Sequence, residues 1–254
     1  RVTVNDPLTE YFFGVAHWGG SKLSNLLTHT SGMPELTDSI FFEERLYSRV
    51  KTERILNFIK GRDLAFKPGT SFRYSHSNYF LIAQVIEIGL EVYYYDFIKT
   101  DIYQQIKMDR SSFLSRQPLR QRAQGYDGNK KVREINPAMF FGSADATSTV
   151  IDLMKWDAAV MRSKMFTKLS RDTFFGKFVD VKSMRASFGA GFFVRKGGAW
   201  NEYFTVGNIP GFSGVNKILH RPSTGDDTYV VILTNGTDVK GLDQAATLIG
   251  NAAR

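Results

Sequence analysis

The sequence predicts an α+β fold, in which a mostly helical stretch is followed by an antiparallel sheet. In the first two thirds of the chain, apolar residues recur at helical spacing, most clearly over residues 79–88. After Gly189 the apolar period shortens from about 3.6 to about 2 residues, as expected of strands. Turn signals such as Pro210-Gly211 separate these strand-like runs. Helices followed by strands in this order are typical of α+β domains.

Length, composition and charge exclude several classes of protein. The 254 residues suffice for one large domain or two interleaved domains, and 43% of them are hydrophobic. The net charge of +8 is spread thinly, with no basic run beyond Lys130-Lys131, so we expect no nucleic-acid partner. No apolar run is long enough for a membrane span. The absence of cysteine excludes disulfides, cysteine-zinc sites and thiol catalysis.

The first half is predicted to be helical between loops. Residues 1–13 form an extended entry with a turn at Asp6-Pro7, and Ser21 is placed to cap a short helix. The predicted helices cover residues 21–27, most of 39–58, 79–88 with Gly89 as the stop, and 93–106.

The second half begins with a polar, irregular stretch over residues 111–137. Ser148-Thr149 then precedes a helical pattern and is expected to cap it. The predicted strands are 191–195, 202–206, 212–220 and 228–234, and a helix over 238–253 follows them.

Residues 66–87 contain the most distinctive local pattern. The turn Lys67-Pro68-Gly69-Thr70 leads to Tyr74 and then to the polar cluster Ser75-His76-Ser77-Asn78, directly before an apolar helix. The pattern therefore brings a phenol, an imidazole and hydroxyls together at a helix start. Polar groups on such loops are where sites tend to be built.

These residues resemble a known superfamily. The pattern PGT-x-F-x-YS-x-SNY over residues 68–79 looks like the second motif region of the serine β-lactamases and penicillin-binding proteins. It is closest to the branch of class C β-lactamases, DD-peptidases and esterases. LLTHTSGMP at residues 26–34 is similar to the LLTHTSGLP loop of that branch, and STVIDLMKW at 148–156 resembles its STxxDLxxW helix. The resemblance covers essentially the whole chain and thins over 90–140.

The resemblance implies a β-lactamase/transpeptidase-like architecture. It has an antiparallel sheet flanked by helices, plus an all-helical domain, with the site in the cleft between them. We assign residues 1–20 and 186–254 to the sheet domain and 21–185 to the helical domain. The chain matches the family from just after its nucleophile helix, so the N-terminal strands and that helix are expected to be missing. A complementing N-terminal segment or second chain is the partner that this implies.

Acyl transfer in this superfamily needs a serine activated by a nearby base, usually Ser-x-x-Lys at a helix start. The expected position lies before Arg1. Ser48-Arg49-Val50-Lys51 has the spacing but follows the LLTHTSGMP loop and sits on a charged helix face. We interpret it as surface.

The second motif, Tyr-x-Asn in that branch, is Tyr74-Ser75-His76 here. The resemblance assigns Tyr74 to proton transfer, as the catalytic residue, and places His76 where an asparagine binds the substrate amide. A neutral imidazole nitrogen donates or accepts one hydrogen bond, whereas an amide does both. His76 could also act as a base, or be a loop histidine satisfied by its neighbours.

The third motif aligns, through Pro210-Gly211-Phe212, with Thr205-Val206-Gly207. Thr205 replaces the basic residue that normally pairs with a substrate carboxylate. Gly207 keeps the small residue against which substrate lies, and Asn208 is placed to supply a backbone N–H to the oxyanion. The four histidines show no metal-ligand spacing, so neither a metal nor another cofactor is predicted.

Two functions remain open. The first is a serine hydrolase that acts on a small-molecule or peptide amide or ester through an acyl-serine. The alternative is a non-catalytic, penicillin-binding-like protein or a part of a larger assembly. Loss of the cation at Thr205 argues against substrates with a free carboxylate. The family points to an extracytoplasmic bacterial location, although the sequence itself shows no targeting signal.

Overall fold

The structure is a computed structural model that describes residues 2–253, so the first and last residues of the predicted sheet domain lie outside it. The chain forms two compact units. The first unit contains the residues up to Asp101 together with 113–116 and 134–146, and the second contains 102–112, 117–133 and the residues from Thr147 onward. Each unit is described by itself. The division predicted above, 1–20 with 186–254 and 21–185, groups the residues differently and stays a prediction.

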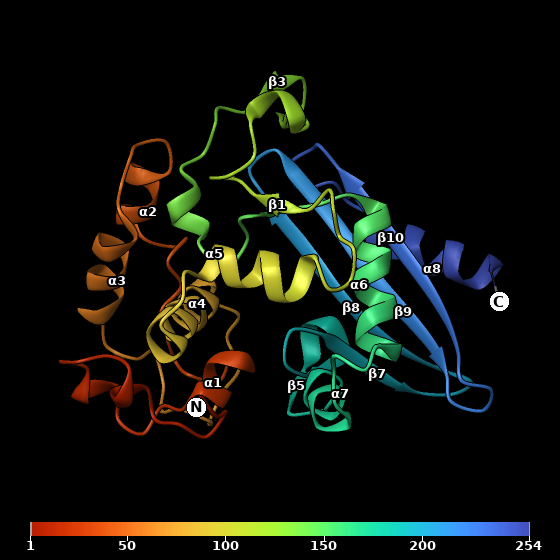
Figure 1. Ribbon diagram of the computed structural model, residues 1–254, viewed down its shortest axis with the longest axis horizontal. Helices are drawn as coiled ribbons and strands as arrows, with labels where there is room; N and C mark the ends of the chain where they lie inside the picture. Colours follow the sequence, from red (N-terminus) through yellow and green to blue (C-terminus); the bar gives the residue numbers. More distant parts are fainter. Residues whose placement is uncertain (1, 254) are drawn as a thin grey trace. The chain divides into compact units, whose positions relative to one another are not determined.

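The first unit is helical. Its helices are α1 (Leu23–Leu27), α2 (Ile40–Arg45), α3 (Thr52–Lys60), α4 (His76–Leu90) and α5 (Tyr94–Phe97), labelled in Figure 1. Single 3-10 turns occur at Leu8–Glu10, Ala16–Trp18 and Pro137–Phe140. A π-helical turn at Ile98–Tyr103 follows α5, and its last two residues already belong to the second unit. The longest helix, α4, packs against α1 and buries one side, including Phe80, Leu81 and Val85.

The stretch 39–58, predicted to be mostly helical, contains α2 and most of α3 with a break between them. The backbone between them turns because a distant residue bonds its carbonyl groups: Asn136 N–H donates to the carbonyl of Leu46 (2.6 Å) and Asn136 Nδ2 to that of Ser48 (2.7 Å). Carbonyls used in this way no longer accept from the next helical turn.

Three predicted helix boundaries were also wrong. Ser21 does not cap α1, because its hydroxyl donates to the carbonyl of Trp18 (2.7 Å). Helix α4 begins at His76 and runs through Gly89. A side chain at Gly89 would be too close to its neighbours, because a Cβ there would lie 2.6 Å from a methyl carbon of Val2. Glu91, with a left-handed φ of 55°, ends it. The helix predicted over 93–106 is α5 followed by the π-helical turn.

The second unit contains a six-stranded antiparallel sheet in the order β10-β9-β8-β7-β6-β5. Its strands are β5 (Val179–Val181), β6 (Ala186–Phe188), β7 (Phe193–Gly197), β8 (Trp200–Ile209), β9 (Phe212–Arg221) and β10 (Asp226–Thr234). A small hairpin of β2 (Tyr126–Asp127) and β3 (Lys130–Lys131) belongs to the same unit. The two-residue strands β1 (Ser112–Phe113) and β4 (Ala146–Thr147) lie where the chain passes from one unit to the other. The predicted α+β fold class is confirmed.

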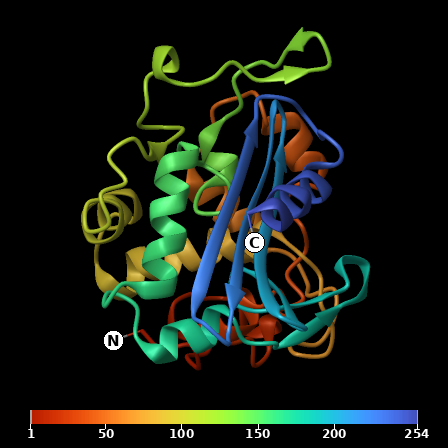
Figure 2. The same cartoon turned by 90° about the vertical axis from the view of Figure 1, so that its right-hand side faces the viewer.

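Helices cover both faces of this sheet. Figure 2 shows α6 (Val150–Arg162) along one face and α8 (Leu242–Ala252) on the other. The shorter α7 (Lys168–Phe174) and the 3-10 turns at Leu119–Gln121 and Lys182–Met184 complete the unit. On β9, Ile218 joins the core under α6 whereas Val215 joins the core under α8, as the strand period of two requires. The predicted cap of α6 is confirmed, since Thr149 Oγ1 accepts from the N–H of Asp152 (3.2 Å).

Strand β8 extends past its neighbour β7. The β7–β8 pairing ends at Phe193 opposite Phe204, while the β8–β9 pairing continues to Ile209 opposite Phe212. Residues 205–209 therefore pair with β9 on one side only within this sheet. Among residues 2–253, no helix has both the length and the apolar character needed to span a membrane.

Gly189 provides a test of the packing in the second unit. A Cβ at this position would lie 2.1 Å from the carbonyl oxygen of Phe174, which is backbone and cannot swing away. We expect Gly189→Ala to lower the free energy of unfolding by about 1–3 kcal/mol, measured by urea denaturation. Gly207→Ala is the matched control, because nothing lies within 4 Å of a Cβ there. Equal effects of the two substitutions would contradict this packing.

Candidate functional site

The predicted site residues fall into two groups. Tyr74 and His76 belong to the first unit, at the start of α4, and Thr205, Gly207 and Asn208 belong to the second unit, on β8. The structure thus places two residues in one local group and three in another, and each group is described separately.

In the first group, His29 fixes the loop that precedes α4. Its ring is buried, and its Nδ1 accepts from the backbone N–H of Ser75 (3.2 Å) and from Asn78 Nδ2 (2.9 Å). Asn78 Oδ1 in turn accepts from the hydroxyl of Ser31 (2.5 Å). Burial, and then the nearby His76, lower the pKa of His29 to about 3. His29 is therefore a neutral acceptor that ties the 29–31 loop to the first turn of α4.

Glu35, rather than one of the serines at the helix start, caps α4. The hydroxyls of Ser75 and Ser77 instead donate to the carbonyl of Pro34 (3.2 and 2.7 Å). Glu35 Oε2 accepts from the backbone N–H of His76 (2.6 Å). A carboxylate at this end of a helix is also favoured by the helix dipole. Glu35 lies 41 positions before His76, so no local spacing pointed to it.

The same carboxylate orients the imidazole of His76. Glu35 Oε1 lies 3.1 Å from His76 Nδ1 and also accepts from the backbone N–H and the hydroxyl of Thr37 (2.9 Å each). Burial by itself raises the pKa of Glu35, but the bonds from His76 and Thr37 outweigh it and lower the pKa to about 2. The ionised carboxylate can only accept, so His76 Nδ1 carries the proton of this hydrogen bond. Among the described residues, His76 Nε2 has no hydrogen-bond partner, so it is the ring atom that can meet a ligand.

Tyr74 lies against both histidines. Its ring stacks at a tilt on His29, with centroids 4.2 Å apart, and meets His76 edge to face at 5.7 Å. Desolvation by these neighbours, and then the negative charge of Glu35, raise the pKa of the Tyr74 phenol. The residue is nevertheless 46% exposed, so the hydroxyl is desolvated only in part. At neutral pH this phenol is protonated and can donate a proton.

In the second group, the backbone of β8 is accessible. Gly207 is exposed, and a Cβ there would touch nothing, so the protein itself does not require a glycine. The side chain of Asn208 is already used: its Oδ1 accepts from the hydroxyl of Ser213 (3.1 Å) and from the N–H of Asp238 (2.7 Å). Thr205, opposite Asn216 on β9, is half-buried. The three residues on β8 therefore present backbone N–H and carbonyl groups rather than charged side chains.

The chance Ser-x-x-Lys match lies on the surface. Ser48 follows α2, whereas Lys51 is the N-cap of α3, so the two do not share a helix. Both residues are exposed, and the Ser48 hydroxyl makes only long contacts to the carbonyls of Glu44 and Arg45 (3.4 and 3.5 Å). Within residues 2–253, no three His, Asp or Glu side chains are grouped so that they could bind a metal ion.

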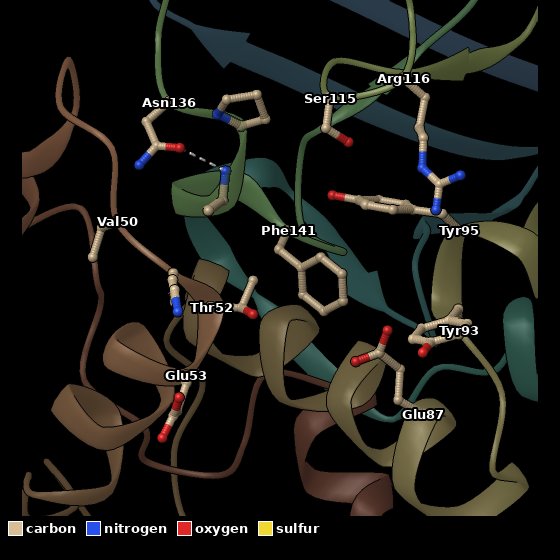
Figure 3. Close-up of a pocket in the computed structure, with 13 residues that line it drawn as sticks. Val50, Thr52, Glu53, Glu87, Tyr93, Tyr95, Ser115, Arg116, Asn136 and Phe141 are labelled. Atoms are coloured by element: carbon tan, nitrogen blue, oxygen red, sulfur yellow. Dashed lines mark hydrogen bonds between the residues drawn. The ribbon is translucent and has the colours of Figure 1, made fainter.

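The first unit also contains a shallow pocket of about 610 Å³, shown in Figure 3. Several of its polar groups already have partners within the protein. Glu87 accepts from the N–H of Tyr94 (3.0 Å), Tyr95 donates to Asp145 (2.6 Å), and the guanidinium of Arg116 lies over the ring of Tyr95. The lining residues, which include neither Tyr74 nor His76, are Val50, Lys51, Thr52, Glu53, Glu87, Tyr93, Tyr95, Ser115, Arg116, Asn136, Pro137, Ala138 and Phe141.

Comparison with known proteins gives consistent matches. The sequence profile of the Beta-lactamase family matches residues 1–254. The penicillin-binding protein PbpX of Bacillus subtilis is 25% identical over 241 residues, covering 92% of this chain and 56% of that protein. Penicillin-binding protein 4* of the same species is 24% identical over 216 residues, covering 74% and 48%. The chain thus spans about half the length of these curated relatives.

Solved structures share the fold. A penicillin-binding protein from Bacillus halodurans superposes with a TM-score of 0.81 at 20% identity, covering 100% of this chain and 78% of that one. The D-amino acid amidase from Ochrobactrum anthropi SV3 superposes with a TM-score of 0.82 at 18% identity, covering 99% and 79%.

The Glu35 carboxylate provides a pH-dependent test. We expect Glu35→Gln to lower the free energy of unfolding at pH 7 by about 1–3 kcal/mol, because the charged acceptor of His76 and Thr37 is lost. The pKa of Glu35 is lowered from 4.5 to about 2, so its contribution is complete above pH 4.5 and disappears as the pH falls toward 2. Urea denaturation at pH 7 and pH 3 measures this. The exposed Asp63→Asn is the control, and a pH-independent loss in Glu35→Gln would contradict the ionised state.

Proposed function

Since this chain belongs to the Beta-lactamase family, we propose that it functions as a serine hydrolase that transfers the acyl group of an amide or ester through an acyl-serine. The observation that supports this most directly is the group at the start of α4. There an ionised Glu35 orients His76, and the protonated Tyr74 lies against the same imidazole. A proton carrier beside an oriented ring is an arrangement suited to acyl transfer.

Tyr74 is proposed as the proton donor. Its phenol remains protonated at neutral pH, so it can protonate the leaving group when the bond between the acyl carbon and the amine or alcohol breaks. The nucleophilic serine is proposed to come from a Ser-x-x-Lys segment of the kind that this family uses, in the same polypeptide or in a complementing chain.

His76 is proposed to bind the substrate as an acceptor. Because Nδ1 is hydrogen-bonded to Glu35, the ring is proposed to present the lone pair of Nε2 to the substrate. It therefore selects a substrate N–H at a position where an asparagine would also have bound a carbonyl. This substitution narrows the range of substrates rather than removing the binding group.

On β8, Gly207 and Asn208 are proposed to bind the substrate through the backbone. Residues 205–209 extend past β7, which suits an extended acyl substrate that adds along the free edge of the strand. The N–H of Asn208 is proposed to stabilise the oxyanion, since a backbone donor does not depend on the side chain. Thr205 supplies no cation, so we propose a neutral amide or ester without a carboxylate at this point. The similar structure from Ochrobactrum anthropi is named a D-amino acid amidase, and an amide substrate falls within the class proposed here.

Turnover of acyl compounds tests the proposal. We expect protein purified from its native source to hydrolyse one of a D-amino-acid amide, an aryl ester or a β-lactam, with a transient acyl adduct visible by mass spectrometry. Tyr74→Phe should lower kcat about 10²–10⁴-fold, because the proton donor is lost. Tyr93→Phe, an exposed tyrosine outside the group, should leave kcat unchanged. Absence of both turnover and adduct would favour the non-catalytic binding protein.

The acceptor role of His76 predicts a change in specificity. We expect His76→Asn to raise kcat/KM by about 2–10-fold for an amide that presents a carbonyl to this side chain, because the asparagine amide can donate one additional hydrogen bond. His76→Ala should lower kcat/KM for all substrates. The measurement is steady-state kinetics on a matched pair of substrates that differ only in that N–H or carbonyl. Equal effects on both substrates would contradict the assignment.

A further inference from the structure

Two buried oxygen atoms in the second unit are left without partners. Helix α6 lies along one face of the sheet (Figure 2), and its Asp157, which is 0% exposed, meets Asn216 of strand β9, which lies between β10 and β8. Asn216 Nδ2 donates to Asp157 Oδ1 at 2.7 Å. The other two oxygens, Asp157 Oδ2 and Asn216 Oδ1, are both buried, and neither has a hydrogen-bond partner among residues 2–253.

One added proton satisfies both atoms. Buried oxygens without hydrogen bonds are uncommon, and each is destabilising. An ionised carboxylate can only accept, and so can an amide oxygen, so the pair cannot be completed while Asp157 is charged. Rotating the Asn216 amide does not change this count, because an oxygen would then face the first carboxyl oxygen instead. A protonated carboxyl group and an amide, by contrast, match as donor and acceptor at both positions.

The surroundings of Asp157 favour this neutral form. Burial raises the pKa of Asp157 to about 7, and the bond from Asn216 opposes only part of the increase. None of the charged or titratable groups on the packed elements acts on this carboxyl. Those groups are Asp152, Lys155 and Arg162 on α6, Tyr203 on β8, His220 on β9, Asp227 and Tyr229 on β10, Arg171 on α7, and Lys107, Asp109 and Arg110 in the segment before β1.

The Asp157–Asn216 pair lies beside the end of β8 that extends past β7. In the sheet register, Asn216 is opposite Thr205 of β8 on one side and opposite Val231 of β10 on the other. Side chains that face one another in an antiparallel pair point to the same face of the sheet. The contact that joins α6 to β9 is therefore made at the strand position next to Thr205, where β8 passes the end of β7.

We propose that Asp157 carries a proton on Oδ2 and donates it to Asn216 Oδ1, so that the two side chains form a ring of two hydrogen bonds that positions the substrate strand β8. The assignment of β8 to substrate rests on the proposed function, whereas the ring does not. The ring makes the position of Thr205 depend on pH. When Asp157 loses its proton, one of the two bonds is lost and two oxygens repel each other across the helix–sheet contact.

The direction of the pH effect follows from linkage. The pKa of Asp157 is raised in the folded protein from 3.8 to about 7, so its stabilising contribution is complete below pH 3.8 and is lost as the pH rises toward 7. Between about pH 5 and 7, folding takes up one proton at this site, and the unfolding equilibrium constant should rise about tenfold per pH unit from this group alone.

Asp157→Asn tests the ring without removing it. The introduced amide reproduces the neutral acid: it donates to Asn216 Oδ1 and accepts from Asn216 Nδ2 with no titratable proton. We expect this variant to lose the tenfold-per-unit pH dependence and to have a higher urea midpoint than the wild type at pH 8. Asp152→Asn is the matched control on the same helix. Its equally buried carboxylate accepts from Lys155 Nζ (2.9 Å) and is ionised, so the control should lose stability and keep the pH dependence.

Two spectroscopic measurements complete the test. The infrared difference spectrum between the wild type and Asp157→Asn near pH 5 should contain the carbonyl band of a buried carboxylic acid, because the band of Asp145, whose pKa burial raises to about 6, is common to both proteins and cancels. Amide resonances of Thr205 and Gly207 should shift with one midpoint near pH 7 in the wild type and remain fixed in the variant. An absent acid band together with an unstable variant at every pH would overturn the ring and indicate a carboxylate bridged by water.

A present acid band with no movement at Thr205 would overturn the positioning role. Neither measurement requires turnover, so an inactive protein, which would contradict the proposed function, leaves this test intact.

Discussion

The buried carboxylate of Glu35 is the interaction on which the first unit's polar group depends. One ionised side chain caps α4, orients His76, and contributes to the raised pKa of Tyr74. Its four hydrogen bonds compensate for the burial of a charge, which would otherwise be strongly unfavourable. The group is therefore preorganised, because the ring orientation of His76 and the protonated state of Tyr74 are set before any ligand arrives.

The second unit follows a different constraint, since both faces of its sheet must be covered. Strand β9 places a polar residue on each face at adjacent positions, Asn216 toward α6 and Lys217 toward α8. Lys217 is fully buried and compensated by Asp243 at 2.9 Å and by the hydroxyl of Thr247 at 2.7 Å. Asp157, behind Asn216, has no countercharge and is compensated by neutrality instead. These are the two ways in which a low-dielectric interior accommodates an ionisable group.

Local pattern predicted the parts of this fold that local interactions determine. The strand period and the turn at Pro210-Gly211 predicted the positions of β8 and β9 to within a few residues. The hydroxyl of Thr149 predicted where α6 begins. The motif resemblance identified Tyr74 and His76 as candidate site residues, and their roles remain proposals. The family and the α+β fold were both readable from sequence.

Long-range contacts account for most of the rest. The break between α2 and α3 is set by Asn136, and the cap of α4 by Glu35, each far away in sequence from the backbone that it bonds. Gly89 looked like a helix stop, but the nearby Val2 explains the missing side chain. The pattern around Asp157 gives no sign that its carboxyl meets Asn216 across the helix–sheet contact.

The discontinuity of the first unit has a kinetic consequence. Residues 134–146 complete it, and Asn136 bonds the carbonyl of Ser48 across a separation of 88 positions. A contact that closes so long a loop forms only after the entropy of loop closure has been lost. Folding rates fall as the mean sequence separation of the contacting residues increases. During synthesis on the ribosome, α2 and α3 emerge well before the segment that fixes the turn between them. The helical unit is thus completed late, and until then the nascent chain exposes the apolar surface that Met139 and Phe140 later cover.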